Sequence, residues 1–229
     1  MSAAPNGGPP EPASYPRTPR TTPNRLPGRA RYDAGAIHAV LDEALICHLG
    51  YVVDGEPLVL PTIHARVGAT LYVHGSTGAR LMRAIPAEGL PVCVTVTQVD
   101  GLVLARSQFH HSMNFRSVVV RGLATLVDDP AERERALTAI VDHVVPGRTA
   151  ASRPADRREL AATDVLRVPL EEVSLKQRDG SPGDDDVDLA LPHWAGVIPV
   201  RTSFGDPVPA ADLAPGIGVP EHVSGYRRP

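Results

Sequence analysis

The sequence has few cysteines, few aromatic residues and no long apolar run. Its two cysteines, Cys47 and Cys93, lie in separate apolar stretches and form no CxxC or zinc-binding spacing, so we expect buried, reduced thiols. No stretch approaches the roughly 18 apolar residues of a membrane helix, and the first residues lack the apolar core of a signal peptide. These absences predict a cytoplasmic protein that does not enter a membrane.

A strong net charge is also missing. The formal net charge is -3 and the isoelectric point is near 6.3, so no overall positive field attracts nucleic acid or anionic lipid. The glycine fingerprint of a parallel dinucleotide-binding fold, the GxSxG motif, the P-loop and the protein-kinase motifs are absent as well. We therefore expect neither a nucleic-acid partner nor serine-hydrolase or nucleotide-driven chemistry.

The composition is that of one globular unit with many turns. Hydrophobic residues make up 42% and charged residues 21% of the 229 positions, and there are 20 glycines and 24 prolines. Residues 1–30 are rich in proline and lack apolar periodicity, which predicts a disordered tail. We place the folded domain at residues 31–178. Residues 179–229 are predicted to form an extended, partly docked arm that carries Trp194, the single tryptophan.

Alternation of apolar and polar residues predicts a chain made mostly of strands. The predicted strands span 46–53, 57–67, 70–75, 91–99, 102–107, 115–127 and 165–178. Helical spacing predicts helices at 33–45, 78–85 and 130–143. The dipeptides Asp54-Gly55 and Asp100-Gly101 are typical of tight hairpin turns between antiparallel strands. The order predicts a mainly β fold in which six to seven antiparallel strands form a small barrel with helices packed outside.

One segment has the features of an anion site. The stretch LYVHGSTGARLMRAI, residues 71–85, runs from a strand through a turn of small residues into a helix. Ser76 or Thr77 is predicted at the helix N-cap, and Arg80 lies in the first turn. Free N–H groups at a helix start and a nearby arginine both favour a phosphate, although plain capping with a solvated arginine gives the same pattern.

A polar strand face supports this site. In PTIHARV, alternation places Thr62, His64 and Arg66 on one face and the apolar residues on the other. Beside the strand that contains His74, these side chains would converge on the same helix start and form a pocket for a phosphate with a planar ring above it. The alternative is an exposed face of the barrel.

A metal site is not expected, although the chain has nine histidines. His110 and His111 are adjacent, and adjacent residues of an extended chain point to opposite faces. No HExxH motif and no cysteine companion accompanies them.

Four stretches together resemble the pyridoxamine 5'-phosphate oxidase-like, flavin-binding split-barrel superfamily, in its branch of flavin-nucleotide-binding and nitroimidazole-resistance-related proteins. They are CHLGYVVDGEPLVLPTIHAR, LYVHGSTGARLMRAI, VCVTVTQVDGLVLARSQFHHSMNFRSVVVRG and SLKQRDGSPGDDDVDLALPHWAGVIPV, in the order found in the family. The resemblance covers about residues 31–202. It implies a split β-barrel homodimer that binds FMN at the subunit interface.

The resemblance also implies a set of cofactor-binding residues. These are Pro61, Thr62, Ile63 and His64 along the flavin ring, Val73, His74 and Gly75 beside it, Ser76, Arg80 and Arg66 at the phosphate, and Arg116 and Ser117 for further polar contacts. The classical oxidases carry glutamine where Ser117 stands. Trp194 either covers the partner's cleft or anchors the arm, and the anchor is preferred. Lys176 and Arg178 are expected at a solvated strand edge rather than at a phosphate.

The implied activity is that of an FMN-dependent oxidoreductase acting on a small molecule, either nitroreductase-like or pyridoxamine-phosphate-oxidase-like. NADH or NADPH is a candidate donor. His74 is the predicted catalytic residue, as a proton donor, and the alternative is a hydrogen bond from His74 to the cofactor. Oxidation of vitamin B6 is not the first choice, because the oxidase pattern of paired basic residues near a C-terminal tryptophan is not found. The other hypotheses are a non-catalytic flavin or haem carrier or sensor, and a deazaflavin-dependent reductase.

Overall fold

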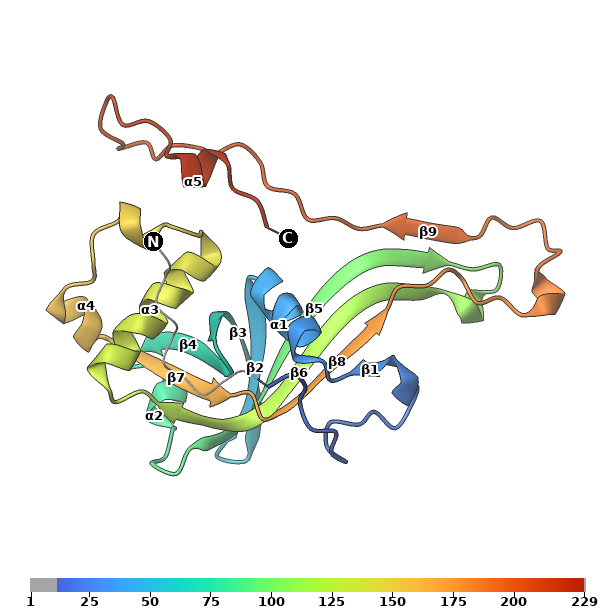
Figure 1. Ribbon diagram of the computed structural model, residues 1–229, viewed down its shortest axis with the longest axis horizontal. Coiled ribbons are helices and arrows are strands. Elements are labelled where there is room, and N and C mark those ends of the chain that lie inside the picture. The colour runs from blue at the N-terminus through green and yellow to red at the C-terminus, as the bar shows by residue number, and fades with distance from the viewer. Residues whose placement is uncertain (1–11, 229) are drawn as a thin grey trace.

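The computed structural model describes residues 12–228 of the chain (Figure 1). Within this range the strands are β1 Ala30–Arg31, β2 Ile46–Val53, β3 Glu56–Val67, β4 Thr70–Ser76, β5 Leu90–Leu104, β6 Ser112–Leu126, β7 Thr163–Pro169, β8 Glu172–Arg178 and β9 Gly196–Pro199. The α-helices are α1 Ala34–Glu43, α2 Arg80–Arg83, α3 Pro130–Val144, α4 Arg157–Ala161 and α5 Glu221–Ser224. None of the helices described here is long and apolar enough to cross a membrane.

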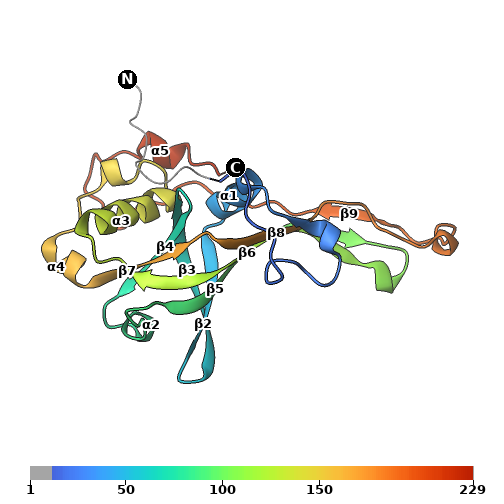
Figure 2. The same cartoon turned by 60° about the horizontal axis from the view of Figure 1, so that its bottom comes forward.

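The strands form one antiparallel sheet that curls into a partly closed barrel. Their order is β1-β8-β6-β7-β4-β3-β2-β5-β9, and an additional pairing of β6 with β5 closes the ring. β5 and β6 are long and continue past the barrel as a projecting hairpin, which β9 follows along one edge (Figures 1 and 2). α3 lies over one side of the barrel, and α2 and the β2–β3 hairpin lie on the side away from α3 (Figure 2). The prediction of a mainly β fold with outer helices is confirmed.

The two Asp-Gly dipeptides behave differently. Asp54 and Gly55 both have positive φ angles, 55° and 78°, and they form the predicted tight turn between β2 and β3. Asp100 and Gly101 form no turn. They lie inside β5, where the register with β6 shifts between Val99 and Gly101, so the dipeptide is a bulge in one long strand. The predicted second hairpin at this position is wrong because β6 continues to pair with β5 on both sides of the dipeptide.

The segment before β1 differs from the predicted tail. Tyr15 is 4% exposed and belongs to the main core, and its hydroxyl lies 2.6 Å from Nε2 of His38. The Tyr15 N–H donates to the Tyr32 carbonyl, and Ser14 forms a bridge with Asp33. Most of residues 12–30 are exposed, but buried Tyr15 and Thr21 and a few backbone hydrogen bonds attach this segment to the domain. The rest of the predicted tail, residues 1–11, lies outside the described residues.

Helix caps follow the sequence signals. The Asp33 carboxylate accepts the N–H of Ala36 at the start of α1. Asp129 caps α3, with Pro130 in its first turn. These local rules place both helices within a few residues of their predicted bounds.

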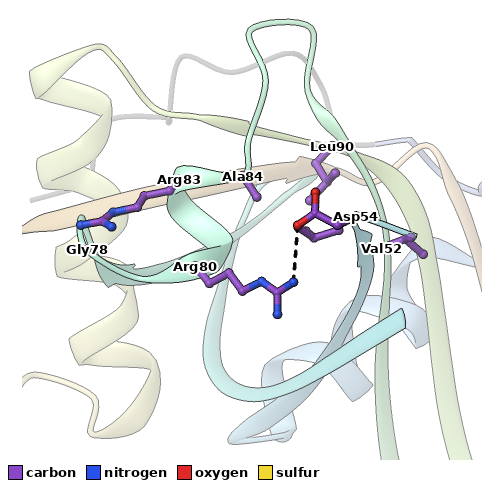
Figure 3. Close-up of a pocket in the computed structure, with 8 residues that line it drawn as sticks. Val52, Asp54, Gly78, Arg80, Arg83, Ala84 and Leu90 are labelled. Carbon is purple, nitrogen blue, oxygen red and sulfur yellow. Dashed lines mark ion pairs between the residues drawn. The ribbon is translucent and has the colours of Figure 1, made fainter. Parts of the chain in front are cut away.

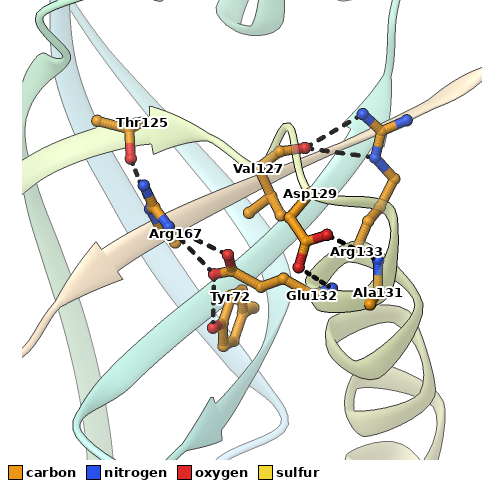
Figure 4. A network of polar contacts seen from close by, with 8 residues as sticks. All are labelled: Tyr72, Thr125, Val127, Asp129, Ala131, Glu132, Arg133 and Arg167. Carbon is orange, nitrogen blue, oxygen red and sulfur yellow. Dashed lines mark hydrogen bonds and ion pairs between the residues drawn. The ribbon is translucent and has the colours of Figure 1, made fainter. Parts of the chain in front are cut away.

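A polar network attaches α3 to the barrel (Figure 4). The hydroxyl of Tyr72 in β4 donates to Oε1 of Glu132 in α3 at 2.9 Å. Arg167 in β7 donates to the other oxygen of Glu132 at 3.1 Å and to Thr125 in β6 at 3.0 Å. Burial and the hydrogen bond to Glu132 raise the pKa of Tyr72 to about 12. The network therefore ties one helix to three strands.

Two apolar clusters form the core. The larger fills the barrel and the contact with α1, and the smaller lies between α3 and strands β3, β4 and β7. Cys47 is fully buried in the larger cluster, and burial raises its pKa to about 12. Cys93 is only partly buried, which differs from the predicted burial, and both thiols are free.

The C-terminal arm follows the projecting hairpin. Asp184, whose side chain is 1% exposed, accepts the backbone N–H of Arg106 at 2.7 Å and bonds its guanidinium at 2.9 Å. β9 then pairs with residues 101–104 of β5. Trp194 is 67% exposed, and its ring lies beside Gly196 at the start of β9.

Candidate functional site

An open cleft of about 580 Å³ lies between α2, the β2–β3 turn and the start of β5 (Figure 3). Its lining residues are Val52, Val53, Asp54, Gly78, Arg80, Arg83, Ala84 and Leu90. We call it the arginine cleft, because two arginines of the short helix α2 border it. The cleft exists because the tight turn at Asp54-Gly55 and the helix after β4 reach the same side of the barrel.

The two arginines have few competing partners. Nη2 of Arg80 lies 3.6 Å from Asp54 and 3.9 Å from Glu56, and the three side chains are more than half exposed. Such long ion pairs between exposed groups contribute little. Arg83 forms no ion pair with any described residue, and its guanidinium lies beside Gly78 (Figure 3). The two guanidinium groups point in different directions, that of Arg80 toward Asp54 and that of Arg83 toward Gly78 (Figure 3), and neither is held by a short ion pair to a described residue.

The turn before α2 differs from the predicted N-cap. Ser76 closes a tight turn by accepting the N–H of Gly78 at 3.2 Å, and the N-cap position is Ala79. Since alanine has no side-chain acceptor, no side chain caps the first N–H groups of α2. Gly75 lies close to Met82, because a Cβ added at Gly75 would lie 2.7 Å from the Met82 Cε atom. The role of Gly75 that the structure shows is close packing of α2 against β4.

The structure does not bring His64, Arg66 and His74 together. His64 in β3 pairs with Val73 in β4, and directly paired residues share a face, so His74 points to the opposite face. His64 is 0% exposed, and its Nε2 bonds the carbonyl of Leu41 at 2.9 Å. Burial, together with the neighbouring ring of His143, lowers the pKa of His64 to about 4. The predicted polar pocket is wrong, since the β3–β4 register decides which side chains meet.

His74 is half-buried and does not line the arginine cleft. Burial lowers its pKa, so it is neutral near pH 7, and its Nδ1 is buried without a hydrogen-bond partner among the described residues. The proton-donor role of His74 stays a prediction.

Two further predicted residues are engaged elsewhere. Arg66 forms a bidentate pair with Asp42, at 2.9 and 2.6 Å, and also bonds the carbonyl of Gly68. Arg116 bridges Asp100 and Glu43, and these hydrogen bonds raise its pKa. Their guanidinium groups hold α1 and the β5 bulge in place, so neither lines the arginine cleft.

The remaining predicted residues lie on strands. Val73 is buried in the core, and Ser117 exchanges a hydroxyl contact with Thr97 at 3.1 Å. Pro61, Thr62 and Ile63 lie in β3, where they pair with residues 46–48 of β2. Of all the residues predicted to bind the cofactor, only Arg80 lines the arginine cleft.

A second cleft of about 290 Å³ lies above β2 and β5. Its lining residues are Glu43, Ala44, Leu45, Ile46, His48, Thr97, Gln98, Thr202, Phe204 and Arg228. We call it the His48 cleft, because His48 points outward from β2 and forms no hydrogen bond with a described residue. The cleft has both apolar and polar lining residues, and the His48 ring forms no hydrogen bond with a described residue.

Sequence reasoning missed Arg83 and His48, although each has a signal. Arg83 follows Arg80 by three residues, which places both on one side of a helix. His48 stands in ICHLG between inward-facing Cys47 and Leu49, so strand alternation assigns it to the outer face.

A family model described as pyridoxamine 5'-phosphate oxidase matches residues 33–177. The chain belongs to this family. The split-barrel assignment made from the sequence resemblance is thereby confirmed, and the pyridoxamine 5'-phosphate oxidase family fold accounts for the β-barrel with outer helices. No curated protein sequence matches the chain.

Two solved structures are similar over nearly the whole chain. The flavocytochrome Anf3 from Azotobacter vinelandii is 39% identical, with a TM-score of 0.86 over 93% of this chain and 98% of that one. An FAD and haem binding protein from Mycobacterium smegmatis is also 39% identical, with a TM-score of 0.82 over 87% and 98% of the chains. A 5-nitroimidazole antibiotic resistance protein from Bacteroides thetaiotaomicron shares the fold, at 22% identity and a TM-score of 0.54 over 64% and 85%.

Proposed function

We propose that this protein binds a flavin nucleotide and that its phosphate groups lie in the arginine cleft. The observation that carries the proposal is the pair of arginines, Arg80 and Arg83, on one cleft with only long, exposed ion pairs to compete. Guanidinium groups bind phosphate through paired, charge-assisted hydrogen bonds. The two most extensive matches described above are named as a flavocytochrome and as an FAD and haem binding protein, which supports a flavin as the ligand.

The number of phosphates that the cleft accepts distinguishes FMN, which has one, from FAD, which has two. The sequence resemblance predicts FMN, with one phosphate, whereas the Mycobacterium smegmatis relative is named for FAD. Two arginines on one helix suit a diphosphate as well as a monophosphate. Denaturing the purified protein and weighing the released cofactor distinguishes FMN from FAD, and from a deazaflavin.

Titration of the apoprotein with flavins tests the site itself. We expect Arg80→Ala to weaken FMN and FAD by about tenfold or more while riboflavin, which lacks phosphate, changes little. Arg135→Ala removes an exposed arginine of α3 and is the matched control. Equal losses for riboflavin and the nucleotides in Arg80→Ala would contradict phosphate binding in this cleft.

We further propose a redox function toward a small acceptor, with NADH or NADPH as the donor. A bound flavin supplies hydride or electron transfer, and the protein supplies binding, orientation and exclusion of water. Reduction of the bound cofactor by either donor, followed by turnover of nitroaromatic or quinone acceptors, supports an oxidoreductase. Binding without reduction or turnover over a broad panel favours a carrier.

Haem is a second candidate ligand, and the His48 cleft is its proposed site. An outward imidazole without a hydrogen-bond partner among the described residues lies beside Leu45, Ile46 and Phe204. A neutral imidazole ligates haem iron, and the apolar part of the lining suits the face of a porphyrin. We expect His48→Ala to abolish the haem absorption band after reconstitution with haemin, whereas His193→Ala, in the exposed part of the arm, keeps it. Retention of the band in His48→Ala would place the haem elsewhere.

A homodimer that completes both clefts is proposed from the outer face of β2 and β3. Ile46, Val52 and Val59 are 44%, 54% and 67% exposed, and the strand register places them on the same face as His48. Ile46 borders the His48 cleft and Val52 borders the arginine cleft. Because an apolar strip connects the two clefts, a second copy seated on it would enclose a cofactor on both sides.

A further inference from the structure

The face of the sheet that carries His48 continues onto the projecting hairpin. His48 in β2 pairs with Thr95 in β5, and directly paired residues share a face. Alternation along β5 places Val99 on this face as well, and Val99 pairs with Phe115 in β6. Met113 keeps the same face beyond the bulge, because it lies two residues before Phe115 in β6. One outer face therefore runs from β2 and β3 onto the hairpin.

On the hairpin this outer face is apolar and exposed. Leu102 in β5 pairs with Met113 in β6 and with Ile198 in β9, so the three side chains form one row across three strands. They are 37%, 52% and 48% exposed, in that order. The next residues along the strands point the other way and are covered, since Val103 is 1% exposed and Asn114 is 8% exposed. Strand alternation thus leaves the apolar row on the uncovered side.

The only tryptophan of the chain lies on the same face. Leu104 follows Leu102 by two residues in β5 and pairs with Gly196 in β9. A Cβ added at Gly196 would lie 2.8 Å from two ring carbons of Trp194, so the indole fills the space where a side chain of residue 196 would stand. Trp194 is nevertheless 67% exposed. Tryptophan is among the residues that most often dominate the binding energy of a protein interface.

The charges near the hairpin favour a protein as the partner. Asp185 lies 3.2 Å from His110 at the end of the hairpin, and Asp186 and Asp188 follow in the same short turn. These carboxylates would repel anionic lipid headgroups and nucleic-acid phosphates. An exposed apolar face in this setting suits the surface of another protein chain.

A second copy of this chain is the partner that the sheet itself indicates. The strip of Ile46, Val52 and Val59, from which the homodimer is proposed, belongs to the same outer face. Three side chains fall far short of the roughly 800 Å² that each partner of a stable complex buries, so a stable dimer has to cover more of this face. In a two-fold dimer the same patch is buried on both copies. Each hairpin reaches past its own barrel, where a second copy can meet it (Figures 1 and 2).

We propose that the outer face of the projecting hairpin, formed by Leu102, Met113, Ile198 and Trp194, docks on a second copy of this chain. The inference rests on the proposed homodimer and extends its interface to the C-terminal arm. Ile198 and Trp194 lie beyond residues 33–177, which the family model matches. The arm therefore adds contacts to the dimer that the barrel does not supply.

Sedimentation of the full-length protein tests this interface. Met113→Asp buries an unpaired carboxylate in each copy, so we expect the dissociation constant of the dimer to rise about a hundredfold or more. Val219→Asp is the matched control, because Val219 is also 52% exposed but lies in residues 200–228, the C-terminal strap, outside the sheet. Trp194→Ala adds no charge to the hairpin and should weaken the dimer about tenfold or more. Urea unfolding shows whether each variant keeps its barrel.

The fluorescence of Trp194 gives a second readout, because the chain has no other tryptophan. Its side chain is 67% exposed within one copy, so a shielded indole in the dimer reports contact with the partner. We expect the parent dimer to show blue-shifted emission and weaker quenching by acrylamide than Met113→Asp at the same concentration. Val219→Asp should match the parent.

The outcomes separate this inference from the homodimer on which it rests. A dimer that tolerates Met113→Asp, or one in which acrylamide reaches Trp194 as freely as in the monomer, would overturn docking through the hairpin and leave the strip on β2 and β3 as the interface. A parent protein that is monomeric at every concentration would overturn both.

Discussion

His64 is a buried imidazole that resists protonation, and this makes stability depend on pH. Its folded pKa of about 4 lies below its ordinary value of 6.5, so the unfolded chain binds more protons between these values. The free energy of unfolding should therefore fall as pH drops below about 6.5, by on the order of 3 kcal/mol near pH 4. Burial lowers the pKa of His74 and His143 as well, which adds in the same direction.

Urea unfolding at several pH values between neutral and acid checks this prediction. His64→Gln should lose a large part of the pH dependence, whereas the exposed control His193→Gln should keep it. A parent protein equally stable at both ends of the range would contradict a buried neutral His64.

At the residue scale, the alternation of side chains between the two faces of a strand could be predicted from the sequence. Contacts between residues far apart in the chain could not. The pattern PTIHARV correctly places Ala65 on one face, where it packs against α3, and His64 and Arg66 on the other. The partners of that second face are the Leu41 carbonyl and the Asp42 carboxylate, at the end of α1. No spacing rule connects positions more than 20 residues apart, so the pairing of Arg66 with Asp42 could not be read from the sequence.

The bulge in β5 positions β9. Substitution of Gly101 by alanine, which adds one methyl group, tests this. A Cβ added at Gly101 would lie 2.9 Å from Cγ1 of Val197 and 3.3 Å from the carbonyl of Ile198. We expect Gly101→Ala to displace β9 and to speed tryptic cleavage after Arg201 by about fivefold, with little change in barrel unfolding. Gly180→Ala is the control, since its added Cβ meets nothing within 4 Å. Equal cleavage rates would show that β9 tolerates the methyl group.

At the element scale, the dipeptide Asp-Gly occurs twice and forms a tight turn at one place and a strand bulge at the other. Asp54-Gly55 turns the chain because β2 and β3 end there, and both residues take positive φ angles. Asp100-Gly101 continues the strand, because β6 supplies partners beyond it, to Ser112. The local signal is the same in both cases, and only the length of the neighbouring strand decides between a turn and a bulge.

For the whole molecule, the outer face of β2 and β3 predicts self-association. We expect sedimentation to show a dimer for the parent chain and a monomer for Val59→Asp, because a carboxylate would be buried in the apolar strip. Val208→Asp is the control, as Val208 is 90% exposed and lies in the strap. A monomeric parent protein, or a dimer that tolerates Val59→Asp, would contradict this interface.

The architecture of the whole molecule was largely predictable, and the contacts that attach its two ends were not. Strand patterns and turn residues led to a mainly β barrel because most of them act between neighbours in sequence. Tyr15 lies in the core because His38 and the residues before α1 receive it, which is a tertiary effect. The bonds of Arg228 to α1 and α3 span more than 80 residues in sequence, and a single exposed-looking arginine gives no sign of them.

The short strands at the two ends of the sheet also bear on solubility. β1 covers the edge of β8 with two residues, and β9 covers residues 101–104 of β5 with four. An uncovered edge offers a row of unpaired N–H and C=O groups to other chains. A chain shortened to end before Gly196 would leave the projecting part of β5 open along this edge. Such a chain should aggregate by strand-to-strand pairing at high concentration, even though its barrel is intact.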